Sequence, residues 1–171
     1  MTTDISQLTF RLPTEDDFPR VQYGLTHWWG GLGGDAGAQQ RRLLVPRLFL
    51  QHFCLTSQVV EDGEGRLVAF LVGFLSQDRA DEAYIHFVGV DPEWQGSGVG
   101  RAMYERFFAA VRTAGRTRVR CLTGPANRAS VAYHRRLGFR VEPGALDFDG
   151  IPATPDYDGE GLPRVLFVKE L

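Results

Sequence analysis

The chain has 171 residues, of which 43% are hydrophobic and 23% are charged, and its formal net charge at pH 7 is -2. A chain of this length and apolar content can bury one core large enough for stability, so we expect a single domain over residues 1–171. The near balance of acidic and basic residues excludes a protein that binds nucleic acid through overall positive charge. A small neutral ligand, or a site with local charge, is the better expectation.

The cysteines and the first residues predict a reducing compartment. Cys54 and Cys121 lie far apart in largely apolar or strand-like runs, which favours buried free thiols over a disulfide framework. Residues 1–10 contain no basic stretch followed by an apolar core, and no apolar run approaches the roughly 20 residues that span a bilayer. We therefore expect a cytoplasmic protein that is neither secreted nor inserted in a membrane.

The first half of the chain predicts two helices and a hairpin after an edge strand at residues 8–12. Residues 13–16 then form a turn that begins a helix. Trp28 and Trp29 lead into five glycines between Gly30 and Gly37, which predicts a loop. A second helix is expected over residues 43–53, with Pro46 in its first turn. Residues 59–61 and 67–76, around a turn at 62–65, predict the hairpin, and residues 83–90 predict the next strand.

The second half predicts helices alternating with strands. A helix runs from residue 98 to Gly115, a strand covers 118–123, and a short helix over 129–137 ends at Gly138. Residues 139–142 and 164–169 predict two closing strands, separated by a loop of about twenty residues rich in Asp, Gly and Pro. Strands paired in hairpins early and joined by helices later predict an α+β or mixed α/β fold rather than a βαβ array.

A glycine-rich turn joins the strand at 83–90 to the following helix. It runs Gln95, Gly96, Ser97, Gly98, Val99, Gly100, Arg101. Alternating glycines let successive backbone N–H groups point into one concavity, and the first turn of the helix adds unpaired donors and a positive dipole end. The turn therefore predicts an anion site. It lacks the Gly-Lys-Ser/Thr ending of a P-loop and has a different third interval from the dinucleotide fingerprint, so a flexible loop is the remaining alternative.

The residues around this turn resemble the GNAT superfamily of N-acetyltransferases. Its acetyl-CoA motif has Gln or Arg, two residues, Gly, one residue, then Gly or Ala, after a strand ending in Val. Gln95, Gly98 and Gly100 fill this pattern. Further along the chain, a set of residues resembles the second conserved block of the family: Asn127, Ser130, His134, Leu137, Gly138 and Phe139. The clear match covers roughly residues 83–141, and the N-terminal half matches only in layout.

The resemblance implies one N-acetyltransferase domain over residues 1–171, with a central, mostly antiparallel mixed sheet that is splayed at a bulge and flanked by helices. It implies acetyl-CoA as cosubstrate and no metal. The coenzyme would be bound by residues 95–101 together with Asn127, Ser130 and His134. Val88, Gly89 and Val90 would guide the pantetheine arm, with the Val88 N–H as the oxyanion donor. Gly89 inside an apolar strand independently predicts a bulge or a close backbone approach.

The expected acid–base groups are histidines. His86 shares a strand face with Val88 and is the best-placed base, because some family members carry a catalytic histidine there. Others carry Glu two residues earlier, where this chain has Tyr84. A packed, hydrogen-bonded His86 and Glu82 acting through water are the alternatives.

The family's usual general acid is a tyrosine, and the sequence departs from the family there. The matching position holds His134, one residue after Tyr133, and the roughly 100° step of a helix cannot aim both side chains at one sulfur. We expect His134 near the sulfur and Tyr133 packing inward, unless the thiol leaves without an acid. Asn127 would bond either the coenzyme or its own loop.

The acceptor side is less defined. Trp28, Trp29 and the glycine run wall an acceptor pocket, or the tryptophans are core aromatics. An acidic loop either attracts a cationic amine or is simply solvated; its residues are Asp147, Asp149, Asp156, Asp158 and Glu160. Their spacing lacks the EF-hand pattern.

The function predicted is transfer of an acetyl group from acetyl-CoA to a primary amine, by direct attack and a tetrahedral intermediate. The alternative is a noncatalytic acyl-CoA-binding sensor or partner-binding module of the same fold, and a nucleotide-binding protein is a distant third. The expected acceptor is a small-molecule or peptide amine, with neither nucleic acid nor membrane as partner. Members of the family often pair through apolar edges, so the resemblance allows a homodimer.

Overall fold

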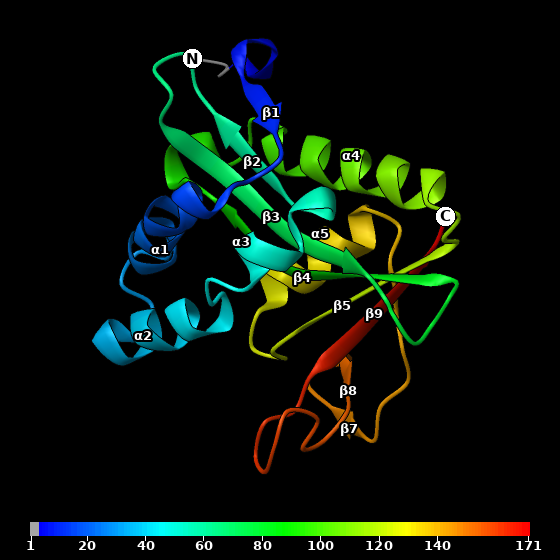
Figure 1. Cartoon of the computed structure of the whole chain (residues 1–171). Helices are drawn as coiled ribbons and strands as arrows, with labels where there is room; N and C mark the ends of the chain where they lie inside the picture. The colour runs from blue at the N-terminus through cyan, green and yellow to red at the C-terminus, as the bar shows by residue number, and fades with distance from the viewer. Residues whose placement is uncertain (1–3) are drawn as a thin grey trace. The chain divides into compact units, whose positions relative to one another are not determined.

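A computed structural model describes residues 4–171. Its segments can be followed by residue number in Figure 1. The chain divides into two compact units. The first comprises the residues up to Phe74 together with Ile85–Val111, and the second comprises Leu75–Tyr84 and Arg112–Leu171. The boundary falls inside two strands and near the end of one helix, so each of these three elements contributes residues to both units. The expectation of one domain over the whole chain stays a prediction.

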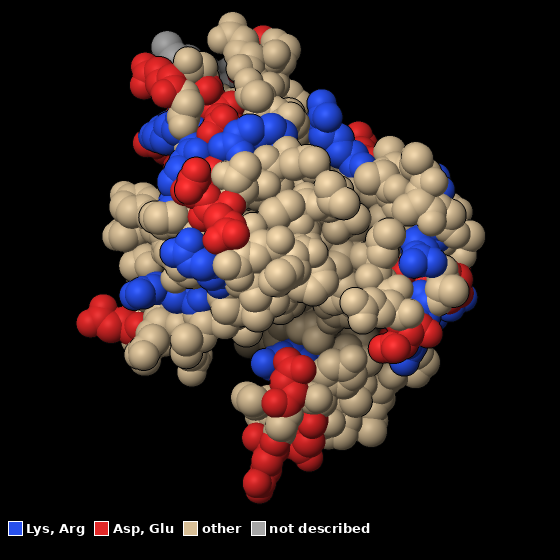
Figure 2. Space-filling view, in the orientation of Figure 1, with Lys and Arg blue, Asp and Glu red and all other residues tan. Residues whose placement is uncertain are grey.

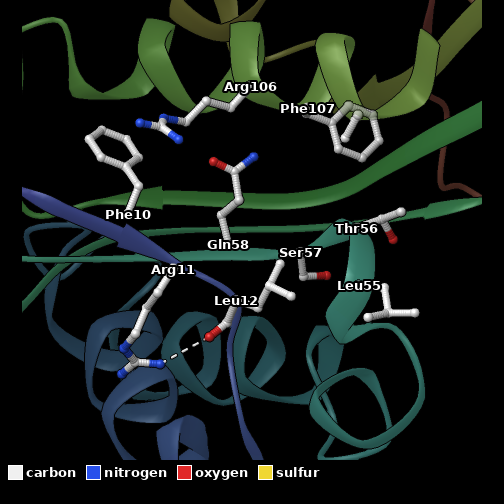
Figure 3. A pocket seen from close by; sticks show the side chains of 10 residues that line it. Phe10, Arg11, Leu12, Leu55, Thr56, Ser57, Gln58, Arg106 and Phe107 are labelled. Atoms are coloured by element: carbon white, nitrogen blue, oxygen red, sulfur yellow. Dashed lines mark hydrogen bonds between the residues drawn. The ribbon is translucent and has the colours of Figure 1, made fainter. Parts of the chain in front are cut away.

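The first unit holds most of the helices. Its elements are β1 (Thr9–Arg11), α1 (Phe18–His27), α2 (Gly34–Leu44), α3 (Phe49–His52), β2 (Gln58–Glu61), most of β3 (Leu67–Leu75) and β4 (Glu82–Val90), and α4 (Val99–Thr113). Within it, α4 covers one face of the strands and the helices that precede β2 cover the other (Figure 3). A cluster of buried side chains joins α1 to β2 and β3, with Val21, Leu25, Val59 and Phe70 among its members.

The second unit holds the shorter strands. Its elements are β5 (Arg118–Thr123), α5 (Arg128–Arg136), β6 (Arg140–Val141), β7 (Leu146–Asp147), β8 (Pro152–Ala153) and β9 (Val165–Glu170). The hydrogen-bonded order of the main sheet is β1-β2-β3-β4-β5-β9-β6. β4 is parallel to β5, whereas β1·β2, β2·β3, β5·β9 and β6·β9 are antiparallel. The predicted mixed, mostly antiparallel sheet flanked by helices is confirmed.

Most of the predicted elements agree with the structure to within a residue or two. The hairpin at 59–76, the strand at 118–123 and the helices before Gly115 and Gly138 are present, and both of these glycines have positive φ, 76° and 85°. Both cysteines are free thiols. Within residues 4–171, no helix combines the length and the apolar character that crossing a membrane requires.

The expected loop and helix around residues 30–53 are wrong in their boundaries. Helix α2 begins inside the glycine run, at Gly34. The Arg41 side chain stabilises the preceding turn, because its Nε donates to the Leu25 carbonyl at 3.0 Å and its NH1 donates to the Leu32 carbonyl at 2.8 Å. The single helix predicted over 43–53 is interrupted, since Pro46 lacks the N–H that would continue α2. A new short helix, α3, starts at Phe49.

The acidic segment after β6 is also more regular than expected. β7 and β8 pair as a small antiparallel hairpin, and Thr154 forms an isolated bridge with Arg164. Ile151 and Ala153 are buried, at 7% and 1% exposure. These two apolar residues anchor a stretch whose composition alone predicts an irregular loop.

Between two hydrogen bonds that join β3 to β4, β4 has one residue more than β3. The Ser76 N–H bonds the Glu82 carbonyl, and the Asp91 N–H bonds the Val68 carbonyl. Between these two bonds β3 advances by eight residues and β4 by nine, which indicates a β-bulge in β4. The bulge lies at His86 and Phe87, because these adjacent side chains both face the core cluster of the first unit, His86 against Phe49 and Phe87 against Trp29. Gly89 lies beyond it, directly against the Phe70 ring, where an added Cβ would stand 2.5 Å from a ring carbon. The sequence left open a bulge or a close approach at Gly89, and the structure has the close approach at Gly89 and the bulge earlier in the strand.

Replacing Gly89 by alanine should destabilise the first unit by about 1–3 kcal/mol, because the new methyl group overpacks against a fully buried phenyl ring. Urea unfolding measures the loss. Gly63→Ala is the matched control, since Gly63 has open space around it and ordinary φ, and it should unfold like the wild type. Phe70→Leu in the Gly89→Ala background should recover part of the loss. Equal unfolding midpoints for the two alanine variants would contradict the close packing.

Candidate active site

The glycine-rich turn is held by its own polar groups. The Asp91 carboxylate accepts from the Glu93 N–H at 3.0 Å and begins a 3₁₀ turn at Pro92–Trp94. The Ser97 hydroxyl donates to the Trp94 carbonyl at 2.6 Å and accepts from the Val99 N–H at 3.3 Å. Ser97 therefore joins the turn to the first residue of α4.

Three alternating N–H groups of this turn have no acceptor within residues 4–171. They belong to Gly96, Gly98 and Gly100. Gly96 and Gly98 have φ of 79° and 95°, in the left-handed region that favours glycine. Unpaired N–H groups that alternate along a turn into a helix N-terminus attract an anion. The anion site predicted from the sequence thus has a physical basis in the first unit.

The backbone of β4 before the turn presents donors away from β3. Because the Asp91 N–H bonds β3, strand alternation turns the Gly89 amide toward β3 and those of Val88 and Val90 away from it. The Val90 carbonyl accepts from Gln95 Nε2 at 3.4 Å, which is consistent with this orientation. The registered pairs of β4 with β5 run from Glu82 to Tyr84 and stop there.

His86 is fixed by contacts from two segments that precede β2. Its Nε2 lies 2.5 Å from the Leu44 carbonyl oxygen, and its ring stacks on Phe49 with centroids 4.3 Å apart. A carbonyl can only accept, so Nε2 carries a hydrogen and the neutral ring has its lone pair on Nδ1. No sequence pattern indicated Leu44 or Phe49 as partners, because both depend on how the chain folds back onto β4.

The two tryptophans have different surroundings. Trp28 belongs to the core and contacts Phe70, with ring centroids 5.8 Å apart. Trp29 is half-buried, meets Phe87 edge-on at 5.7 Å and lies beneath the Arg41 guanidinium at 5.6 Å. Of the two alternatives left open by the sequence, the core assignment holds for Trp28. Trp29 lies beside β4, the strand that carries His86.

Glu82 and Tyr84, the other positions considered for the base, belong to the second unit. The Glu82 carboxylate is 5% exposed and pairs with Arg120 Nε at 2.9 Å and Arg118 NH1 at 3.4 Å. Arg120 continues the network to Glu142 at 2.7 Å. The Glu82 carboxylate is thus engaged in a structural ion-pair network. Burial raises the pKa of the Tyr84 phenol above its ordinary value, so Tyr84 stays protonated.

The packing of His134 and Tyr133 on α5 is the reverse of the expectation. His134 is 7% exposed, its ring stacks on Phe167 at 4.6 Å, and Nδ1 lies 2.8 Å from the Ser130 carbonyl oxygen. Tyr133 is half-buried, with the Arg136 guanidinium 6.0 Å from its ring centroid. Burial lowers the pKa of His134 more than the Ser130 carbonyl raises it, so the ring is neutral at neutral pH. The expectation that Tyr133 packs inward is therefore wrong.

The other predicted polar residues of the second unit bond within it. Asn127 caps α5, with its Oδ1 accepting from the Ser130 N–H at 3.1 Å. In the acidic loop, which is visible in Figure 2, Asp149 pairs with Arg128, Asp158 with Arg164, and Asp156 accepts from the Gly161 N–H. No group of potential metal ligands occurs among the described residues.

Solved structures share this fold. Ard1 from Thermoplasma volcanium matches with a TM-score of 0.73 and 18% identity, over 96% of this chain and 98% of that one. The structure of yncA from Salmonella typhimurium with its cofactor acetyl-CoA matches with a TM-score of 0.64 and 18% identity, over 96% of this chain and 94% of that one. At this identity the likeness establishes the fold.

The sequence comparisons establish the family. A model of the acetyltransferase (GNAT) family matches residues 13–139. L-2,4-diaminobutyric acid acetyltransferase from Streptomyces coelicolor is 32% identical over 125 residues, which cover 70% of this chain and 71% of that protein. Mycothiol acetyltransferase from Thermobifida fusca is 32% identical over 101 residues, or 54% of this chain and 31% of that protein. The chain spans about a third of this last relative, and it belongs to the GNAT acetyltransferase family.

The buried His134 makes stability depend on pH. Its folded pKa lies below the ordinary histidine value of 6.5, so between these two values the folded state binds fewer protons than the unfolded state. The free energy of unfolding should therefore fall as the pH is lowered through this window. His134→Phe keeps a ring against Phe167 but cannot be protonated, and it should lose less stability between about pH 7.5 and pH 5. Urea unfolding at several pH values measures this, and parallel pH curves would contradict the assignment.

Proposed function

We propose that this chain is an N-acetyltransferase that transfers the acetyl group of acetyl-CoA to a primary amine of a small molecule. The observation that carries the proposal is the set of unpaired N–H groups at Gly96, Gly98 and Gly100, at the start of α4. A diphosphate is an anion of the size and charge that such a turn attracts. The acetyl-CoA in the structure of yncA supports this choice of anion.

The reaction needs a donor for the oxyanion and a base for the amine. The amine nitrogen attacks the thioester carbon, the C–S bond of the tetrahedral intermediate breaks, and the coenzyme leaves as a thiolate. The Val88 N–H, which is directed away from β3, is the proposed oxyanion donor. The proton lost by the amine goes to Nδ1 of His86, because the Nε2 hydrogen is committed to the Leu44 carbonyl.

For protonation of the leaving thiolate we favour Tyr133 over His134. A neutral His134 whose Nδ1 hydrogen is directed at the Ser130 carbonyl has no second proton to give. The Tyr133 phenol is half-buried rather than enclosed. Asn127 and Ser130 keep their predicted role near the coenzyme as a proposal, alongside their bonds within α5.

The acceptor proposed is a small primary amine. One relative is named for L-2,4-diaminobutyric acid and another for mycothiol, and both names denote small molecules. Trp29 and the Arg41 guanidinium above it lie on the segment that precedes β2, as do the Leu44 and Phe49 contacts of His86. We therefore place recognition of the acceptor on this segment of the first unit.

Disturbing the glycine-rich turn should weaken acetyl-CoA binding. Gly96→Ala adds a side chain at φ 79° and pushes the turn toward another conformation, so the three N–H groups no longer converge. Calorimetry should show at least about tenfold weaker binding of acetyl-CoA, the effect of losing one charge-assisted hydrogen bond. Gly115→Ala is the matched control, since Gly115 has φ 76° and open space but ends α4 instead of starting it. The same loss in both variants would assign the effect to backbone strain alone.

Removing the base should slow turnover without changing coenzyme binding. His86→Gln keeps an amide N–H for the Leu44 carbonyl but cannot take up a proton at neutral pH, so kcat/KM for the amine should fall by about 10²–10⁴. Release of free coenzyme A is followed with a thiol reagent, using an amine panel that includes L-2,4-diaminobutyrate. His52→Gln, on α3, is the control. Wild-type protein that binds acetyl-CoA but acetylates none of the amines would instead support the noncatalytic alternative.

A further inference from the structure

A cavity lies in the first unit, and no residue of the glycine-rich turn lines it. Its volume is about 290 Å³, and it opens between β1, the segment before β2, and α4 (Figure 3). Most of its wall is apolar, formed by Phe10, Leu12, Leu55, Phe107 and Ala110. None of the residues proposed to bind the coenzyme lines it. The cavity is therefore a candidate site separate from the acetyl-transfer chemistry.

One buried acceptor in this cavity has no donor. The Gln58 side chain donates from Nε2 to the Met103 carbonyl at 3.0 Å, which fixes the orientation of the amide. Its Oε1 is buried and has no hydrogen-bond partner among the described residues. A buried oxygen without a donor costs free energy, so a ligand with a neutral N–H or O–H would be stabilised there.

One cation beside the cavity has no anion. The Arg106 guanidinium lies over the Phe10 ring, 4.4 Å from its centroid, and makes no ion pair within residues 4–171. In Figure 3 the amide oxygen of Gln58 points to the side on which this guanidinium lies. A ligand that contacts both groups would need a hydrogen-bond donor for Gln58 and, beside it, a negative charge for Arg106.

The remaining polar groups of the wall are already engaged. The Thr56 hydroxyl donates to the Gly73 carbonyl at 2.6 Å, and the Ser57 hydroxyl donates to the Phe53 carbonyl at 2.7 Å. Arg11 pairs with Asp17 and Glu61, at 2.8 Å and 2.6 Å. Recognition of a ligand by polar groups is thus left to Gln58 and Arg106.

We propose that this cavity binds a small organic acid with an apolar body and a neutral N–H or O–H next to its carboxylate. The carboxylate pairs with the Arg106 guanidinium, and the neighbouring hydrogen is donated to Gln58 Oε1. N-acyl amino acids and 2-hydroxy acids have this arrangement. A free ammonium group fits less well, because a single neutral amide oxygen does not offset the cost of burying a full charge.

The experiment titrates the protein, without acetyl-CoA, with N-acetyl-L-leucine and follows backbone and side-chain amides by NMR. The expected result is saturable perturbation of the Gln58 side-chain amide and of the Ala110 amide. Two related compounds test the polar contacts: 4-methylpentanoate lacks the donor, and N-acetyl-L-leucinamide lacks the carboxylate. Each should bind at least about tenfold more weakly, because 4-methylpentanoate leaves the buried Gln58 Oε1 without a donor and N-acetyl-L-leucinamide loses the charge-assisted contact with Arg106.

Variants separate recognition from general apolar contact. Arg106→Gln should weaken N-acetyl-L-leucine by at least about tenfold. Arg112→Gln, at another exposed position of α4, should bind like the wild type. Ala110→Trp fills the cavity from an exposed position and should abolish binding while the protein stays folded.

Three results would overturn the proposal. They are no perturbation at saturating probe, equal binding of the three compounds, and perturbation centred on His86 or Gly96 instead of Gln58. The last would place the acid in the proposed acetyl-transfer site. Because the titration omits acetyl-CoA and the variants avoid the proposed catalytic residues, failure here leaves the acetyltransferase proposal standing, and failure of acetyl transfer leaves this one standing.

Discussion

The contact between the Phe70 ring and the backbone of Gly89 is the constraint on which the first unit's site depends. Phe70 is fully buried and also meets Trp28 and Phe87, with ring centroids 5.8 Å and 6.0 Å apart. The ring therefore packs the end of β4 against the core formed by α1 and β3. Interiors at this packing density resist displacement, so the position of β4 is determined by shape as well as by its hydrogen bonds. A side chain at residue 89 would move the strand just where it enters the turn.

The position of this strand has two consequences for chemistry. Beyond the bulge, alternation turns the amides of Val88 and Val90 away from β3, and the turn that follows leaves its glycine N–H groups unpaired. His86, earlier on the same strand, meets the Leu44 carbonyl and the Phe49 ring. One short segment, β4 and the turn after it, therefore supplies both the N–H donors for an anion and a histidine of fixed tautomer. Preorganisation of this kind is what lowers a barrier for acyl transfer, since little has to move when charge develops.

The sequence predicted those parts of the site that depend on local backbone. Three alternating glycines between a strand and a helix specify the turn because their conformation needs no distant partner. It did not predict the environment of His86, because Leu44 and Phe49 reach it through the fold of the segment before β2, about forty residues earlier in the chain. The start of α2 was missed for a similar reason. The turn in front of Gly34 is stabilised by hydrogen bonds from Arg41, seven residues later, which no local pattern indicates.

The reversal on α5 shows where a resemblance to a family is less informative than packing. Matching the family's positions favoured His134 as the group near the sulfur, but Phe139 and Phe167 enclose its ring. Neighbouring residues on a helix point about 100° apart, so enclosing His134 leaves Tyr133 directed elsewhere. The apolar residues at 139 and 167 were visible in the sequence, but their convergence on one side of α5 depends on β9 pairing with β6.

The turn and the Gln58 cavity differ in how much a ligand can gain from each. The N–H groups of the turn lie at an exposed loop, where water can satisfy them, so an anion gains mainly through convergence and the helix dipole. Gln58 Oε1 is buried, so a donor there relieves a cost that the folded protein already carries. Both sites involve α4, one at its first residue and the other at Arg106 and Phe107. A rigid helix alone does not couple two ligands, because coupling requires two states that each ligand prefers differently. An acid bound at Arg106 would therefore change coenzyme affinity only if it shifted α4 between two such states.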